Sequence, residues 1–204
     1  MPLTVRVSEP VEIVPMELRE LEITPPRRDF TPVVERAVAE AKAGRHPGTA
    51  AARELYRTIG VDPTRTRPSS EALLRRVSRG NAFPRINSLV DVANVMSLLS
   101  QTPIGLYDLA ATVGEGVAVR RGQPGEGYEG IGKGWVNVAG RLCVSDSVGP
   151  VGNPTSDSAR TMITTDTEHA LWIWFLPVGE PYLDRAAELI ARFGRGLVTV
   201  VAPE

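Results

Sequence analysis

Residues 127–134, GYEGIGKG, carry the glycine and lysine spacing of a phosphate-binding P-loop as far as Lys133. In a P-loop the next residue is Ser or Thr, whose hydroxyl binds magnesium. Gly134 stands there instead, and the neighbouring residues are typical of a hairpin rather than of a strand that enters a helix. We therefore interpret this segment as a glycine-rich turn.

The residue types that bind metals or act as nucleophiles are sparse. His46 and His169 lie far apart, and Cys143 has no partner at ligand spacing, so we expect neither a metal site nor another cofactor. A single cysteine forms no intrachain disulfide, which is typical of a reducing, cytoplasmic location. No apolar run is long enough to span a membrane, and the first residues do not resemble a secretory signal.

The charge is uneven although the net charge is only −1. Residues 45–85 hold nine arginines against three acids, whereas residues 9–22 hold five glutamates against one arginine. Arginine suits bidentate phosphate contacts, but an arginine-rich helix surface can also be simply solvated. The candidates for RNA contact in this basic stretch are Arg65, Arg67, Arg75, Arg76 and Arg79.

The hydrophobic pattern predicts both helices and strands around these residues. Residues 3–8 and 11–14 alternate with period two and predict a pair of strands that opens the chain. We predict helices over 31–44, 51–60, 69–80, 87–100 and from Pro181 to Gly194, and further strands over 117–120, 135–140, 141–145, 161–165, 170–175 and 197–201.

The helix over 87–100 is apolar except for a narrow stripe of Asn87, Asp91 and Asn94. Buried amides and carboxylates need partners, so the stripe either fixes the turn over 103–108 by hydrogen bonds or lines a pocket. Tyr107 and Asp108 follow in that turn, where the aspartate is suited to cap backbone amides.

Three ordered motifs resemble one family. SLVDVANV (88–95), TPIGLYDL (102–109) and VAVRRGQPGE (117–126) resemble segments of the tRNA-binding and editing domain of the bacterial phenylalanyl-tRNA synthetase beta subunit. LCVSDSVGPVGNP (142–154) resembles the strand and glycine-rich loop that follow there. The likeness is strongest over 75–165.

The resemblance implies a single α+β domain of three layers, with a β-sandwich core of unusual topology flanked by helices. It also implies binding of tRNA or aminoacyl-tRNA, and hydrolysis of tyrosine wrongly attached to phenylalanine tRNA without a cofactor. The 204 residues lack the other regions of the synthetase, so we do not expect aminoacylation by this chain.

Two departures from the family pattern concern catalysis. Gly105 stands where the family has a histidine, and Thr164 or Thr165 stands near the position of its pocket glutamate. A hydroxyl is a poor general base, so the candidate catalytic groups are Asp108, Thr164, Thr165 and Asp166. The candidate pocket residues are Asn87, Asp91, Asn94, Gly105, Tyr107, Gly149, Gly152 and Arg160.

The sequence leaves three functions open. The first is a binding domain for tRNA or another structured RNA, in which hydrolysis is slow or absent. The second is a free-standing hydrolase that acts on mischarged aminoacyl-tRNA, and the third is a protein that binds an amino acid or another small molecule in the retained pocket. The sequence does not indicate the oligomeric state.

Overall fold

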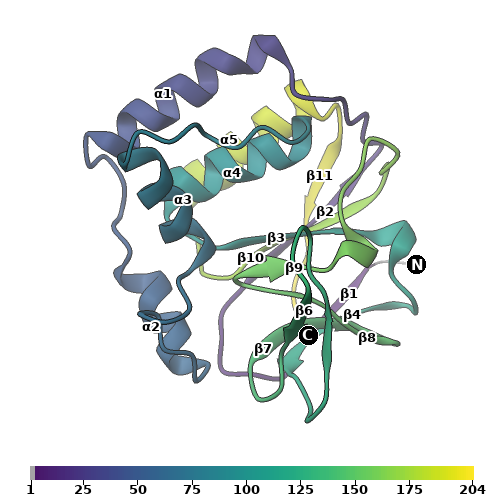
Figure 1. The fold of residues 1–204 in the computed structure, drawn as a ribbon. Coiled ribbons are helices and arrows are strands. Elements are labelled where there is room, and N and C mark those ends of the chain that lie inside the picture. Colours follow the sequence, from purple (N-terminus) through teal and green to yellow (C-terminus); the bar gives the residue numbers. More distant parts are fainter. Residues whose placement is uncertain (1–2) are drawn as a thin grey trace.

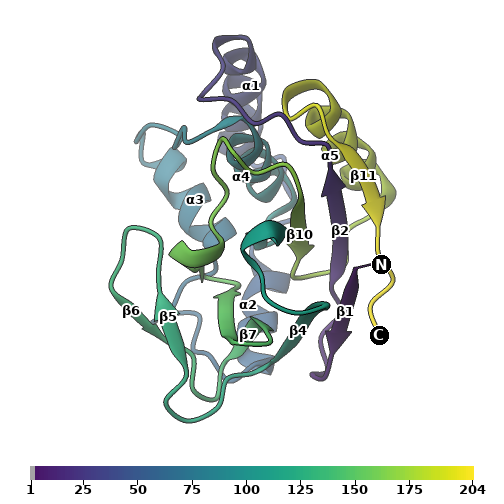
Figure 2. The same cartoon turned by 90° about the vertical axis from the view of Figure 1, so that its right-hand side faces the viewer.

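The computed structural model describes residues 3–204, which form three layers (Figure 1 and Figure 2). Four helices cover one face of a four-stranded sheet, and a five-stranded sheet covers the other face. A further helix, α2 (Ala50–Thr58), adds Leu55 and Tyr56 to the core between the two sheets. This is the α+β fold, a β-sandwich flanked by helices, that the resemblance implies.

The four-stranded sheet is antiparallel, in the order β11-β2-β10-β3. Its central strand β10 is completely buried, because Leu171 and Ile173 face the second sheet while Trp172 and Trp174 face the helices. The strands are β2 (Val14–Arg19), β3 (Ile104–Asp108), β10 (Ala170–Trp174) and β11 (Leu197–Val200).

The five-stranded sheet has the order β1-β4-β7-β8-β9. Only β1 and β4 pair in parallel, and a bulge at Val144 and Ser145 interrupts the pairing of β7 with β8. The strands are β1 (Thr4–Val7), β4 (Gly116–Arg121), β7 (Leu142–Asp146), β8 (Gly149–Asn153) and β9 (Ser156–Asp157). Strands β5 (Gly127–Glu129) and β6 (Trp135–Asn137) form the hairpin expected at the glycine-rich turn.

Two strand predictions are wrong. Residues 3–8 and 11–14 do not pair with each other: β1 lies beside β4, and residue 14 begins β2 in the other sheet. Val5 and Ile13 both enter the core between the sheets, so burial on separate sheets replaces local pairing. Residues 161–165 form the end of a short 3-10 helix, η3 (Ala159–Thr161), and a loop held by local side-chain hydrogen bonds such as Thr164 N to Thr167 Oγ1 (3.0 Å).

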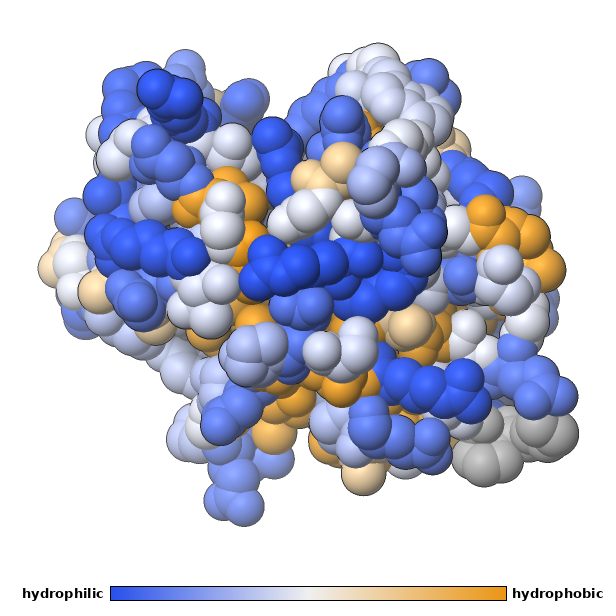
Figure 3. Space-filling model, turned by 90° about the horizontal axis from the view of Figure 1, so that it is seen from below, coloured by the Kyte–Doolittle hydropathy of each residue, from blue (hydrophilic) through white to orange (hydrophobic). Residues whose placement is uncertain are grey.

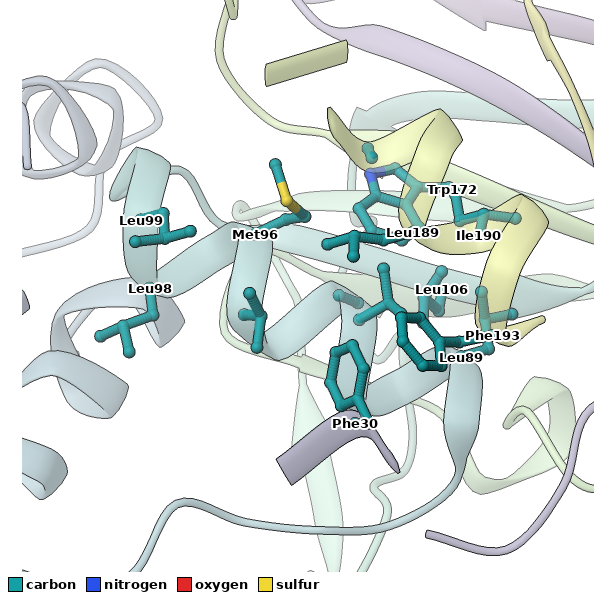
Figure 4. Packing of buried hydrophobic residues seen from close by; sticks show 14 of the residues in the cluster. Phe30, Leu89, Met96, Leu98, Leu99, Leu106, Trp172, Leu189, Ile190 and Phe193 are labelled. Atoms are coloured by element: carbon teal, nitrogen blue, oxygen red, sulfur yellow. The ribbon is translucent and has the colours of Figure 1, made fainter. Parts of the chain in front are cut away.

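The helix layer packs around α4, which is buried on nearly all sides (Figure 4). Asn87 caps its first turn by accepting a hydrogen bond from Val90 N at 2.9 Å. Phe30 meets Phe193 edge to face, with 4.7 Å between ring centroids. The helices are α1 (Thr31–Lys42), α3 (Ser69–Ser78), α4 (Ser88–Ser100) and α5 (Glu180–Phe193).

Candidate functional site

A cavity of about 260 Å³ lies where α4 meets the edge strand β3. Val90, Ala93, Asn94 and Ser97 of α4 line it, and their spacing places them on one face of the helix. Ile104 and Leu106 of β3 line it as well, since alternate residues of a strand share a face. The interior is therefore mostly apolar.

The mouth of this cavity carries exposed apolar side chains. Ile86, Ile131 and Met162 are 58%, 46% and 41% exposed, and all three line the cavity. They come from three separate segments: the loop before α4, the tip of the β5–β6 hairpin and the loop after η3. A cluster of exposed apolar groups around a hollow is typical of a ligand-binding surface.

Asp157 supplies the only carboxylate of the cavity lining. Its Oδ2 accepts a hydrogen bond from Leu106 N at 3.3 Å. Burial raises the pKa of Asp157 to about 7, although this hydrogen bond and the charge of Lys133 both lower it. Asn94 is half-buried, and within residues 3–204 its side chain has no hydrogen-bond partner. The cavity thus offers one carboxyl that titrates near neutral pH and one amide.

Tyr107 lies behind the cavity, where its phenol fills the space over two glycines. A Cβ at Gly105 would lie 2.3 Å from the Tyr107 hydroxyl, and a Cβ at Gly152 would lie 2.7 Å from that hydroxyl and from Asp157 Oδ1. Neither the Tyr107 hydroxyl nor Asp157 Oδ1 has a hydrogen-bond partner of good geometry, although both are buried. Burial, reinforced by Asp157, raises the pKa of Tyr107.

The family model of the B3/4 domain matches residues 51–175, a range that contains every residue lining the cavity. The chain belongs to the B3/4 domain family. This domain is found in the beta subunit of phenylalanyl-tRNA synthetase, so the resemblance read from the sequence motifs is confirmed.

A crystal structure of an N-terminal fragment of the phenylalanyl-tRNA synthetase beta subunit from Pyrococcus horikoshii is similar to this B3/4 chain at 13% sequence identity. The TM-score is 0.48, and the match covers 97% of this chain and 50% of that one. No curated protein matches the chain significantly.

In this B3/4 domain the polar stripe of α4 is divided between two tasks. Asn94 lines the cavity, whereas Asn87 donates to Ile163 O at 3.3 Å. Asp91 is fully buried and accepts hydrogen bonds from Arg85 Nε (2.6 Å) and Ile86 N (2.7 Å). The prediction that the stripe is internal is confirmed for Asp91.

The prediction that the stripe holds the 102–108 turn is wrong for Asn87 and Asp91. Asn87 binds Ile163 and Asp91 binds Arg85 and Ile86, because Asn87 and Asp91 lie near the start of α4 whereas the turn follows its end. Ser97 fixes the turn instead by donating to Thr102 O at 2.8 Å, and Ser70 donates to Gln101 O at 3.0 Å.

The four candidate catalytic residues lie outside the cavity lining. Asp108 accepts hydrogen bonds from Ala110 N (2.9 Å) and Thr167 Oγ1 (2.7 Å), so it caps a short 3-10 helix, η2 (Leu109–Ala111). Thr164 Oγ1 accepts from Asp166 N at 3.2 Å. Asp166 and Thr165 are exposed on the same loop. Asp108 and Thr164 thus have local structural contacts, and the carboxyl that lines the cavity is that of Asp157.

Gly149 and Arg160 border a different hollow, on the outer side of β8. Arg160 binds both oxygens of Asp146, at 2.7 and 3.0 Å, which occupies its guanidinium. Gly152 and Tyr107 pack together as described above. The eight candidate pocket residues therefore lie in several places, and Asn94 alone lines the apolar cavity.

The candidate RNA-binding arginines lie along α3 and the loop before it. Arg67 pairs with Glu71 (3.3 Å) and Arg65 with Asp62 (3.8 Å), while Arg76 Nε donates to Ala82 O at 2.6 Å. Arg75 and Arg79 are exposed, and within residues 3–204 they have no ion-pair partner. Part of the basic stretch is thus neutralised by its own acids.

Across residues 3–204 no cluster of His, Cys, Asp or Glu has the arrangement of a metal site. In the same range, no helix has the length and apolar character needed to cross a membrane.

Sequence reasoning missed Asp157 and the apolar mouth of the cavity. An aspartate between two serines is typical of a turn, so its type and spacing carry no signal of burial. Ile86, Ile131 and Met162 belong to three segments far apart in the sequence, and only the fold brings them together.

Proposed function

We propose that this B3/4 domain binds an amino acid in the cavity between α4 and β3, presented as the aminoacyl group at the end of a tRNA. The observation that carries the proposal is the apolar cavity of about 260 Å³ with the Asp157 carboxyl in its lining. This volume lies near the lower limit of roughly 300 Å³ for small-molecule pockets, which suits a ligand of amino-acid size.

The chemistry of an amino acid matches the cavity in two respects. Its side chain would bury apolar surface against Val90, Ala93 and Leu106. Its ammonium group would lie at Asp157, and the positive charge would lower the pKa of that carboxyl and favour its charged form. The side-chain oxygen of Asn94 is a second acceptor for the ammonium group.

The proposal of tRNA as the carrier rests on the family and on the position of the arginines. Ser69, at the start of α3, lines the apolar cavity, and Thr66, in the segment before α3, lines a second cavity nearby. Arg65 and Arg67 flank Thr66 in sequence, and Arg75 and Arg79 extend along α3. Arginines around the mouth would contact the phosphates of an RNA strand whose end enters the cavity.

A second candidate function is hydrolysis of the aminoacyl ester, which the pKa of Asp157 near 7 favours. In this reaction Asp157 takes a proton from water as the water oxygen bonds to the ester carbonyl carbon. The carbon–oxygen bond to the ribose then breaks, and the ribose oxygen takes the proton back from Asp157. The products are a free amino acid and uncharged tRNA.

The amino-acid proposal is tested by calorimetric titration with a panel of L-amino acid amides, which keep the ammonium group and resist hydrolysis. We expect an apolar member to bind the native chain, and Asp157→Asn to weaken it about tenfold, as for a lost charge-assisted hydrogen bond. Asp166→Asn, which changes an exposed aspartate, is the matched control. Binding that is equally strong in both variants would contradict the role of Asp157.

Val90→Phe places a larger side chain in the cavity and should abolish binding of the same amide. Absence of binding by every amide to the native chain would refute the amino-acid proposal itself. Single-turnover deacylation of aminoacyl-tRNAs then separates the two functions. An acceleration of about a hundredfold that is lost in Asp157→Asn would establish hydrolysis, because a positioned base contributes at least that much.

A further inference from the structure

A second cavity, of about 160 Å³, lies on the other side of the β5–β6 hairpin tip. It is lined by residues of α2, of the loop before α3, of the hairpin and of the turn between β8 and β9. This volume is about half of the roughly 300 Å³ at which pockets hold a whole ligand, so the cavity suits one functional group of a larger ligand.

Two cations and no acid line this cavity. Lys133 and Arg141 are both exposed, and within residues 3–204 neither has an ion-pair partner. Four further cavities within residues 3–204 each contain at least one carboxylate: Asp157, Glu129, or Glu115 in two of them. The electrostatic character of the second cavity is therefore distinct, and it favours an anion.

Neutral groups in the lining add hydrogen-bonding capacity. Asn153 is buried and its Oδ1 accepts from Thr155 N (2.8 Å) and Ser156 N (3.0 Å), which leaves its Nδ2 as a donor. The Tyr56 hydroxyl and Thr155 Oγ1 lie 2.8 Å apart, so one of them donates to the other. Cations together with amide and hydroxyl donors are the groups that bind phosphate oxygens.

The second cavity adjoins the apolar one along three chain segments. Thr66, Lys133 and Ser156 line the cationic cavity, and Ser69, Ile131 and Asp157 line the apolar cavity. Residues 156 and 157 are consecutive, so their Cα atoms lie about 3.8 Å apart. The two cavities therefore border the same piece of chain at this point.

The hairpin tip that separates the cavities is held in place. Ile131 N donates to Asp157 O at 3.1 Å, and Gly130 bridges to Ser158. Lys133 lies close enough to Asp157 for its charge to lower the pKa of that carboxyl.

We propose that the Lys133–Arg141 cavity is a phosphate subsite that binds a phosphate of the nucleotide whose aminoacyl group occupies the apolar cavity. This assignment rests on the proposed function for the identity of the nucleotide. The assignment of an anion site, by contrast, rests on Lys133 and Arg141 and not on the proposed function. One ligand would then contact both sides of the hairpin tip, with its ammonium group at Asp157 and its phosphate at Arg141.

The test compares two ligands with a stable amide link, 3′-(L-phenylalanylamino)-3′-deoxyadenosine and its 5′-phosphate, by calorimetry. We expect the phosphate to strengthen binding to the native chain about tenfold, as for one or two charge-assisted hydrogen bonds. Arg141→Ala should remove this gain and leave the affinity for the unphosphorylated ligand unchanged. Lys133→Ala should remove it too, but Lys133 also acts on Asp157, so Arg141→Ala is the cleaner variant.

Arg36→Ala, which removes an exposed arginine of α1 away from both cavities, is the matched control and should retain the full gain. If the native chain binds both ligands with equal affinity, the subsite is refuted and the amino-acid proposal stands. If it binds neither, the amino-acid proposal fails for this ligand, and ³¹P spectroscopy of inorganic phosphate decides about the subsite. Line broadening that Arg141→Ala removes would support the anion site, and its absence would refute it.

Discussion

Asp157 is the residue on which the chemistry of the apolar cavity depends. Its Oδ2 accepts a hydrogen bond from Leu106 N, and its Oδ1 is buried near the Tyr107 hydroxyl without a hydrogen bond of good geometry. A carboxylate in such surroundings lacks the hydration that it has in water, and its pKa therefore rises to about 7. Burial of this carboxyl lowers the stability of the folded chain at pH values where it must be charged. Strongly shifted pKa values of this kind are common at functional sites.

The pKa of Asp157 predicts a dependence of stability on pH. An unfolded aspartate has a pKa of about 3.9, so between about pH 4 and pH 7 the folded chain holds a proton that the unfolded chain has lost. The free energy of unfolding should fall as pH rises through this window, by at most about 1.4 kcal/mol per pH unit, and then level off.

Asp157→Asn lacks this titration and should gain stability relative to the native chain from pH 5 to pH 8. Urea unfolding of both proteins at four pH values measures the difference, and Asp166→Asn serves as the exposed control. A difference between Asp157→Asn and the native chain that is constant with pH would show that the carboxyl is already charged at pH 5.

The packing around Gly105 explains why this position has no side chain. Gly105 stands where the family pattern has a histidine, and the Tyr107 phenol fills the space beside it. Any side chain at position 105 would displace Tyr107, so the glycine serves the packing between the two sheets. The residues of β3 that line the cavity are its two neighbours, Ile104 and Leu106.

At the scale of elements, Asp91 and Arg85 connect α4, which lines the cavity, to the start of α1. The Arg85 guanidinium also donates to Arg27 O at 2.7 Å and to Thr31 Oγ1 at 3.4 Å, so it links the loop before α4 to the start of α1. Asp91 is fully buried, and this arginine is its charged partner. The pair fixes the loop that presents Ile86 to the cavity mouth.

Loss of Arg85 should therefore be costly. Arg85→Ala leaves a buried carboxylate unpaired, and we expect about 3–5 kcal/mol of destabilisation in urea unfolding. Arg79→Ala, on the exposed surface of α3, should cost less than about 0.5 kcal/mol. A similar small effect of both substitutions would mean that Asp91 is accessible to water.

At the scale of the whole molecule, the distribution of charge matters more than its sum. The stretch 45–85 contains many arginines, but Arg53 and Arg67 both bind Glu71, and Arg57 binds Glu54. The positive charge of this stretch that has no ion-pair partner is thereby reduced to a few exposed side chains, among them Arg75 and Arg79. Seen from below, the surface is mainly hydrophilic, with apolar groups visible between the hydrophilic side chains (Figure 3).

Arg75 and Arg79 provide the test for RNA contact. If they bind phosphates, Arg75→Ala/Arg79→Ala should weaken tRNA binding and reduce the slope of log affinity against log salt by about 1 for each lost contact. The pair Arg28→Ala/Arg36→Ala removes the same charge from η1 (Arg28–Phe30) and α1, and should have little effect. Filter binding over a salt series measures both, and equal slopes in the two variants would exclude a specific contact by α3.

The sequence by itself determined the helices, most of the strands and the family, because hydrophobic periodicity and ordered motifs are properties of neighbouring residues. It indicated that Asp91 is internal, since a polar residue on an apolar helix has nowhere else to lie. It did not determine the partner of β1, because parallel pairing joins residues more than a hundred positions apart. Only the tertiary structure brought Asp157 under α4 and separated Lys133 from Ile131 across the hairpin tip. The physical reason is that burial and charge environment depend on contacts between distant segments, and these contacts give Asp157 its raised pKa and the second cavity its cations.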